Sequence, residues 1–259
     1  MRTVIVGASS GLGRCIAKGL AERGGHVALL ARRYDRLTEA AKEAGPGTVA
    51  IACDVTDETS VKTAIGEAAA ALGGIDALVY TVGVGPLGRL AEIDATTWRS
   101  TFDTNVVGAA LVTAAAIPHL ADSKGVAAYL SSVSASMTPP WPGLGAYVVS
   151  KAALDKLVEA WRAEHPELGF TRVIVGECGG GEGDSMTGFT DGWDPELATE
   201  FGPLWLERNY FNGHLLDVES LIHVIDSILR VGATASVPSV TVAARVGGIP
   251  IPPDAIPAD

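Results

Sequence analysis

The chain has 259 residues, of which 47% are hydrophobic and 19% charged, and its formal net charge is −11. This composition excludes the disordered class and provides enough apolar side chains for a large core. The acidic balance disfavours nucleic-acid binding, because a protein that neutralises phosphates needs a basic face. The three cysteines form no CxxC pair or disulfide framework, so we expect a reducing, cytoplasmic environment and no metal site.

The first residues run directly into a strand-like segment, with no charged and then apolar leader before it. No uninterrupted run of about 18 apolar residues is evident along the chain. We therefore expect a protein without a signal segment or a membrane span.

Short runs rich in β-branched residues alternate with longer runs of helical periodicity. The predicted strands are residues 3–6, 26–30, 48–53, 77–80, 125–130, 171–175 and 239–243, and the predicted helices are residues 14–23, 33–44, 58–72, 97–120, 147–164 and 218–231. This alternation predicts an α/β protein with right-handed crossovers. The expected architecture is one Rossmann domain over residues 1–259, a doubly wound parallel sheet of about seven strands with helices on both faces.

A glycine-rich loop follows the first predicted strand and opens the first helix. Glycines allow the tight turn and let phosphate oxygens approach the backbone N–H groups at the helix start, where the helix dipole favours an anion. A glycine cluster alone is a weak signal, but its place between the first strand and the first helix strengthens it. We expect a dinucleotide pyrophosphate at Gly7, Ser9, Ser10, Gly11, Leu12 and Gly13.

The end of the second predicted strand distinguishes between cofactors. NAD sites usually place a carboxylate there, on the ribose 2′-hydroxyl. Here the strand is followed by Arg32 and Arg33, and no acid occupies these positions. A guanidinium binds a 2′-phosphate through charge-assisted hydrogen bonds, so the sequence favours NADP(H). Asp54 and Val55, after the third strand, are placed to contact the adenine.

The same loop also satisfies G-x-S-x-G, the nucleophile elbow of serine hydrolases, which likewise joins a strand to a helix. A hydrolase needs an oxyanion loop from an earlier strand, and only six residues precede Gly7. None of the five histidines follows a late acidic residue in an evident catalytic loop. We therefore interpret the match as accidental.

Tyr147 and Lys151 are spaced four residues apart at the start of a predicted helix, so their side chains share one face. A nearby ammonium stabilises a phenolate and lowers the pKa of the tyrosine, which can then exchange a proton with a carbonyl oxygen. Just upstream, the strand at residues 125–130 is followed by Ser132 and Ser134. A hydroxyl at this strand end faces the ligand crevice and could hold the substrate carbonyl.

Taken in order, these motifs resemble the short-chain dehydrogenase/reductase family over nearly the whole chain. The loop is similar to the family's TGxxxGxG, with Val6 in place of the threonine. The other matches are the adenine-contacting aspartate, the catalytic asparagine, the catalytic serine and the YxxxK pair, which correspond to Asp54, Asn105, Ser132, Tyr147 and Lys151.

The resemblance implies a role for each matched residue. Tyr147 is the general acid/base, and Lys151 lowers its pKa and binds the nicotinamide ribose. Ser132 orients the substrate oxygen, and Asn105 holds a water that relays protons toward Lys151. Arg32 is the expected NADP selector, with Arg33 as a helper. The family also implies a homodimer or homotetramer formed through the helices at residues 97–120 and 147–164.

Three departures from the family pattern stand out. The NNAG motif is replaced by residues 80–83, of which only the glycine, Gly83, is kept as a cofactor-contacting residue. Ser132 lies fifteen residues before Tyr147, a longer interval than usual, so Ser134 is an alternative catalytic serine. Residues 176–181 replace the PG motif beside the nicotinamide, and either Ser185 or Thr187 takes the place of the threonine that follows it.

Residues 176–217 form the longest interruption between regular elements, and we expect them to form a substrate lid. Either they close an apolar pocket with an acidic rim, with Trp141 as a further wall, or they pack their own aromatics as a solvated loop. The acids and aromatics concerned are Asp184, Asp191, Asp194, Glu196, Glu200, Phe189, Trp193, Phe201, Trp205, Tyr210 and Phe211.

The sequence thus favours an NADP(H)-dependent oxidoreductase acting on a small-molecule carbonyl or secondary alcohol. The alternative is a binding module of the same fold, which senses NADP or a partner without turnover. The complete Asn/Ser/Tyr/Lys set favours the enzyme, and the altered segment at residues 176–181 favours the sensor.

Overall fold

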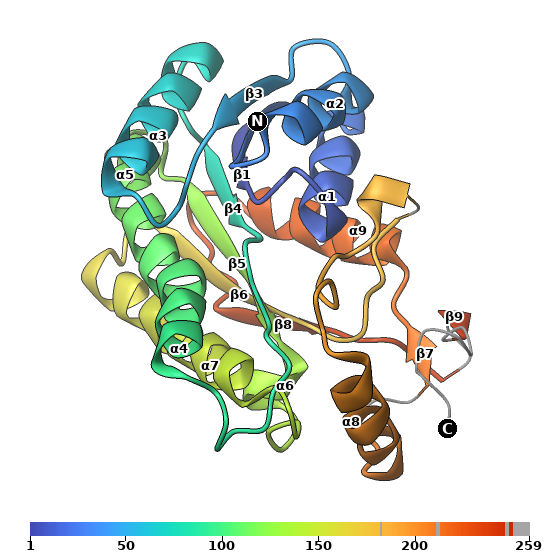
Figure 1. Ribbon diagram of the computed structural model, residues 1–259. Coiled ribbons are helices and arrows are strands. Elements are labelled where there is room, and N and C mark those ends of the chain that lie inside the picture. Colours follow the sequence, from blue (N-terminus) through green and yellow to red (C-terminus); the bar gives the residue numbers. More distant parts are fainter. Residues whose placement is uncertain (182, 211–212, 247–248, 251–259) are drawn as a thin grey trace.

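The computed structural model describes residues 1–181, 183–210, 213–246 and 249–250 (Figure 1). A parallel sheet of seven strands forms its centre, in the order β3-β2-β1-β4-β5-β6-β8. The order reverses between β1 and β4, as in other doubly wound sheets, so the predicted Rossmann fold is confirmed. The strands are β1 (Arg2–Val6), β2 (His26–Ala31), β3 (Val49–Ala52), β4 (Ala77–Tyr80), β5 (Val126–Ser132), β6 (Gly169–Val175) and β8 (Ser239–Val242).

Two layers of helices cover the faces of this sheet (Figure 1). One layer consists of α3 (Glu58–Leu72), α5 (Gly108–Ser123) and α7 (Gly145–Glu164), and the other of α1 (Gly11–Glu22), α2 (Tyr34–Ala44) and α9 (Val218–Leu229). Each layer meets the sheet through its own cluster of buried apolar side chains. Because both faces are buried, the inner strands are continuous hydrophobic runs rather than alternating ones.

Several elements differ from the sequence prediction. The helix expected at residues 97–120 consists of α4 (Ala95–Phe102), the π-helical turn η1 (Asp103–Val107) and α5. The structure also has elements that were not predicted individually: α6 (Val133–Ser136); the 3₁₀ turn η2 (Gly183–Ser185) and α8 (Pro195–Glu207), both within the expected lid segment 176–217; and a small antiparallel pair, β7 (His214–Leu215) with β9 (Ile249–Pro250). Asp194 caps α8 by accepting a hydrogen bond from the Glu196 backbone N–H at 2.9 Å.

The helical run Ala95–Ser123 is long and apolar enough to cross a membrane by length and composition alone, which corrects the expectation that no such run exists. The inward side of its α5 part is fully buried against the sheet, through Ala109, Val112, Ala116 and Leu120. A core helix of an α/β domain passes the same test, so this feature is weak evidence for a membrane span.

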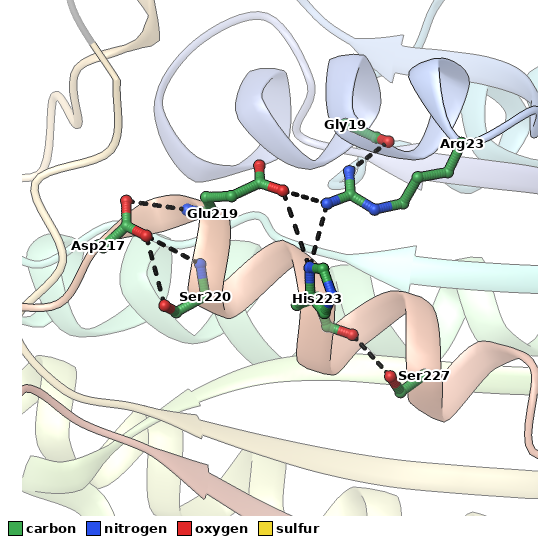
Figure 2. A network of polar contacts seen from close by, with 7 residues as sticks. All are labelled: Gly19, Arg23, Asp217, Glu219, Ser220, His223 and Ser227. Carbon is green, nitrogen blue, oxygen red and sulfur yellow. Dashed lines mark hydrogen bonds and ion pairs between the residues drawn. The ribbon is translucent and has the colours of Figure 1, made fainter.

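Helices α1 and α9 approach each other closely at Gly19, where an added Cβ would lie 2.7 Å from the Ile222 side chain. At the edge of this contact, the Arg23 guanidinium donates to the Gly19 carbonyl at 2.7 Å and contacts Glu219 and His223 on α9 (Figure 2). The apolar contact and its polar edge together fix α1, and with it the end of the glycine loop, which runs into this helix.

Candidate active site

Close contacts of the backbone fix the shape of the glycine loop after β1. Gly7 has a φ of +97° and Gly11 a φ of +55°, values that favour glycine. A Cβ on Gly13 would lie 2.4 Å from the Gly7 carbonyl oxygen, so α1 begins directly against the loop. The Ser10 side chain does not cap α1, so the first N–H groups of the helix receive no hydrogen bond from it.

Thr81 supports this loop from the end of β4, a role that the sequence analysis missed. Its hydroxyl donates to the Val6 carbonyl at 2.8 Å. The same oxygen would lie within 2.6 Å of a Cβ on Gly7 or on Gly13. The departure from NNAG therefore keeps the link between β1 and β4.

The two arginines after β2 take different positions. The Arg33 guanidinium donates to the Ser9 hydroxyl at 3.2 Å and to the Ser10 hydroxyl at 2.6 Å. Arg32 instead acts on Asp54, whose pKa is lowered first by a hydrogen bond from the Thr56 backbone and further by the Arg32 charge. Arg33 therefore contacts the serines of the glycine loop, while Arg32 lies near Asp54.

The hydrophobic members of the predicted cofactor set are largely buried. Val55 is in the core, and its side chain would lie 2.8 Å from a Cβ on Gly108 of α5. Leu12 packs on the apolar cluster between the sheet and α1. Val55 is therefore a core residue, whereas Leu12 is only partly buried.

Tyr147, in the first turn of α7, lies against Ser132 at the end of β5. Burial raises the pKa of Tyr147 to about 12, and the hydrogen bond with Ser132 acts in the opposite direction. The Ser134 hydroxyl is buried behind Ser132 and lies 2.8 Å from its oxygen. Of the two candidate serines, Ser132 is therefore the one that the fold brings to the phenol.

Lys151 lies one helical turn after Tyr147 and is 3% exposed. Its ammonium donates to the Leu130 carbonyl at 2.9 Å and lies 5.9 Å from the centroid of the Tyr147 ring. A Cβ on Gly83 would lie 3.1 Å from this nitrogen, which explains the glycine there. The predicted lowering of the phenol pKa is wrong for this arrangement, because burial outweighs the distant ammonium.

Asn105 is fully buried and joins the end of β4 to α7. Its oxygen accepts from the Val84 N–H at 2.9 Å, while its amide nitrogen donates to the Val84 carbonyl at 2.9 Å and to the Ser150 hydroxyl at 2.8 Å. The Ser150 hydroxyl in turn donates to the Tyr147 carbonyl at 2.7 Å. Asn105 thereby holds the loop after β4 against the helix that carries Tyr147 and Lys151.

Asn105 lies in the π-helical turn η1, a feature frequent at functional sites. The Tyr80 hydroxyl, fully buried at the end of β4, donates to the Thr104 carbonyl at 2.7 Å and satisfies one backbone group of this turn. The π turn aims Asn105 at Val84, a geometry that the helical periodicity did not predict.

The segment that replaces the PG motif folds back onto α1. The Thr187 N–H donates to the Gly179 carbonyl at 2.9 Å, and the Cys15 thiol on α1 lies 3.5 Å from the Ser185 carbonyl oxygen. A Cβ on Gly11 would lie 3.3 Å from the Thr187 Cα. Of the two candidates for the family's threonine, Thr187 is the residue beside the glycine loop.

Aromatic side chains cover Tyr147. The Phe189 ring meets the Tyr147 ring edge-on, with centroids 4.8 Å apart, and the Trp193 indole N–H donates to the Gly85 carbonyl at 2.8 Å. Trp141, Phe201, Trp205 and Tyr210 continue this cluster around α8. The aromatics of residues 176–217 thus pack on one another and on the candidate catalytic phenol.

Two of the expected rim acids have structural partners, since Asp194 caps α8 and Glu200 forms an ion pair with Arg89. Phe211 and the side chain of Asp184 lie outside the described residues. Among the described residues, no group of three or more His, Cys, Asp or Glu side chains could hold a metal ion.

Comparison with known proteins agrees with this geometry. The sequence profile of the short chain dehydrogenase family matches residues 2–191. The chain belongs to this family. It is 36% identical over 179 residues to "11-beta-hydroxysteroid dehydrogenase A" of Sesamum indicum, an alignment covering 67% of this chain and 51% of that protein. The chain thus spans about half the length of that curated relative.

Solved structures of the family share the fold over most of both chains. A dehydrogenase/reductase from Sinorhizobium meliloti 1021 is 25% identical, with a TM-score of 0.78 over 93% of this chain and 92% of the other. A serine dehydrogenase in its closed form with NADP⁺ is 22% identical, with a TM-score of 0.78 over 93% and 94% of the two chains, and supports the fold alone.

In this member of the family, the fold gathers all four residues of the predicted Asn/Ser/Tyr/Lys set at the carboxyl ends of β4 and β5. Sequence reasoning missed the supporting roles of Thr81 and Ser150, and it named Phe189 only as one of the aromatics of the expected lid. The spacing of Ser150 and Lys151 relative to Tyr147 gives a partial signal for Ser150, because the i+3 position shares the buried face of the helix.

Proposed function

We propose that this short-chain dehydrogenase is an NADP(H)-dependent oxidoreductase that interconverts a carbonyl compound and a secondary alcohol. The observation that carries the proposal is the convergence of Tyr147, Ser132 and Lys151 at the strand ends beside the glycine loop. Asn105 fixes the same corner through its three hydrogen bonds. The ligand crevice of a doubly wound sheet lies at this edge.

The residues present fit a dinucleotide that carries a 2′-phosphate. The absence of side chains at Gly7 and Gly13 lets the loop pack closely on Thr81 and on the start of α1, and the Ser10 side chain does not cap the first N–H groups of that helix. The Arg33 guanidinium and the Ser9 and Ser10 hydroxyls form a cluster of donors near this loop. Such donors suit a phosphate dianion, because hydrogen bonds between charged partners are the strong ones. The nicotinamide supplies the hydride donor or acceptor when bound.

Tyr147 is the general acid/base in this proposal. With its pKa raised to about 12 by burial, the phenol is protonated at neutral pH and donates its proton to a carbonyl oxygen. The Ser132 hydroxyl, in contact with the phenol, orients that oxygen. The Lys151 ammonium stabilises the phenolate that remains, and Asn105 holds the backbone around it.

The aromatic cluster supports an apolar, cyclic substrate. Phe189 lies against the Tyr147 ring and Trp193 packs on Phe189, so a substrate that displaces them exchanges aromatic contacts for contacts with its own apolar surface. The relative from Sesamum indicum is named for a hydroxysteroid, which is an alicyclic secondary alcohol. We therefore propose alicyclic ketones and alcohols as the first class to test.

Calorimetric titration with NADPH and with NADH tests the cofactor proposal. We expect the wild-type protein to bind NADPH more tightly than NADH. In Arg33→Ala we expect the affinity for NADPH, but not for NADH, to fall by about 10- to 100-fold, the range for a hydrogen bond to a charged group. Lys42→Ala removes the same charge at the exposed far end of α2 and is the matched control. Equal affinities in the wild-type protein, or equal losses in both variants, would contradict the assignment of Arg33.

Turnover separates the enzyme from the sensor. Tyr147→Phe removes only the phenol oxygen, so we expect NADPH affinity near that of the wild type and a loss of about 100-fold or more in ketone reduction. NADPH oxidation with a panel of cyclic ketones measures it. Cofactor binding without turnover of any of these ketones supports the non-catalytic alternative, whereas equal turnover by the variant would refute the role of Tyr147 as the general acid/base.

A further inference from the structure

Helix α7 carries a row of ionisable side chains that begins with Tyr147 and Lys151 and continues for two further helical turns. Tyr147, Lys151, Asp155 and Glu159 follow one another at intervals of four residues, so they share one helix face. This face packs on β5 and β6. Lys151 and Asp155 are both buried, at 3% and 5% exposed, whereas Glu159 reaches the surface.

Asp155 lies between two cations. One of its carboxylate oxygens, Oδ2, is 4.0 Å from the Arg172 guanidinium of β6, and Lys151 is one helical turn away. Its other oxygen, Oδ1, and the hydroxyl of Ser131 on β5 are both buried. The two groups lie close together, since a hydrogen bond with Ser131 lowers the pKa of Asp155.

A buried carboxylate at position 155 is expected to destabilise the folded protein. Burial raises the pKa of Asp155, and Ser131, Arg172 and Lys151 act in the opposite direction. Arg172 also forms an ion pair with the more exposed Glu159, at 2.9 Å, so its charge has a partner besides Asp155. Lys151 is more deeply buried than Arg172, and its ammonium donates to the Leu130 carbonyl at 2.9 Å.

We propose that Asp155 is a positioning residue that keeps the buried Lys151 ammonium charged beside the catalytic phenol. Burial lowers the pKa of Lys151 to about 8, and Asp155 acts in the opposite direction. The other ionisable groups that face this pair are Tyr147 and Glu159 on α7 and Arg172 on β6, while Ser131 and Asn105 are uncharged. The role in catalysis rests on the proposed function, but the coupling of Asp155 to Lys151 does not.

NMR titration of isotope-labelled lysine side chains tests the coupling directly, with the Lys151 signal assigned by its loss in Lys151→Met. We expect Asp155→Asn, which keeps the shape of the side chain, to lower the pKa of Lys151 by about one unit or more. Asp155→Glu keeps the charge and is expected to retain most of the wild-type value. Glu159→Gln, one turn further along the same helix, is the matched control and should leave Lys151 unchanged.

The two proposals fail separately. An unchanged Lys151 pKa in Asp155→Asn, or an equal shift in Glu159→Gln, overturns the role of Asp155 whatever the turnover. If Lys151 shifts as expected, then the rate of ketone reduction by Asp155→Asn should fall at a lower pH than that of the wild type, because the ammonium is lost earlier as pH rises. Absence of ketone reduction in every variant, with the Lys151 shift present, refutes the proposed function and leaves the coupling intact.

Discussion

Asn105 offers the sharpest test of how the site is built. Asn105→Ala removes three hydrogen bonds, two to the Val84 backbone and one to the Ser150 hydroxyl. At about 1 kcal/mol net for each, the free energy of unfolding should fall by about 3 kcal/mol. For a chain of this size that corresponds to a decrease in Tm of about 6–12 °C, measured by calorimetry or circular dichroism.

Asn105→Asp separates hydrogen bonding from shape, because it has nearly the size of asparagine. The carboxylate can still accept from the Val84 N–H, but it has no donor for the Val84 carbonyl and its charge is fully buried. We expect it to be at least as destabilising as Ala at neutral pH. Its folded-state pKa is raised above the unfolded value of about 3.9, so the penalty is present above the folded pKa and disappears as pH falls below about 4. An Asp variant as stable as the wild type at neutral pH would refute this reasoning.

Two further predictions concern backbone fit and the aromatic cover. Gly13→Ala should lower the free energy of unfolding by about 3 kcal/mol, since its Cβ would lie 2.4 Å from backbone. Gly66→Ala is the control, at an exposed position of α3 with nothing within 4 Å, and should raise the free energy of unfolding by about 0.5–1 kcal/mol. Urea unfolding compares the two variants, and equal effects would contradict the close approach at Gly13. Phe189→Ala should lower the pKa of Tyr147 from about 12 toward about 10 by admitting water. Alkaline titration of phenolate absorbance, taken as the difference from Tyr147→Phe, measures this shift, and an unchanged pKa would show that Phe189 does not cause the burial.

Much of the fold follows from local signals in the sequence. Helix α3 was predicted with its observed bounds because both ends carry strong signals: Asp57 accepts from the Thr59 and Ser60 N–H groups, and Gly73 ends the helix with a φ of +73°. The central strand β4 was likewise predicted with its observed bounds, Ala77–Tyr80, since an apolar run of this length between turn residues is typical of a buried parallel strand.

The parts that the sequence did not predict depend on contacts between distant segments. The position of the Arg33 side chain depends on the path of the chain after β2, which turns it toward Ser10. The contact of Phe189 with Tyr147 joins positions 42 residues apart through an irregular segment. Periodicity and motif spacing carry no information on such contacts, whereas they determine which residues share the face of a single helix.

Burial has opposite effects on the two ionisable residues of the YxxxK pair. It raises the pKa of the Tyr147 phenol and lowers that of the Lys151 amine, because the charged form of each is the one that loses solvation. The phenol therefore stays protonated over the whole neutral range, which is the state that the proposed role as a proton donor needs. The ammonium, in contrast, approaches neutrality at a mildly alkaline pH. As pH rises, the Lys151 ammonium thus loses its proton before the Tyr147 phenol does. The buried carboxylate of Asp155, one helical turn away, raises the pKa of Lys151 and so favours the charged form.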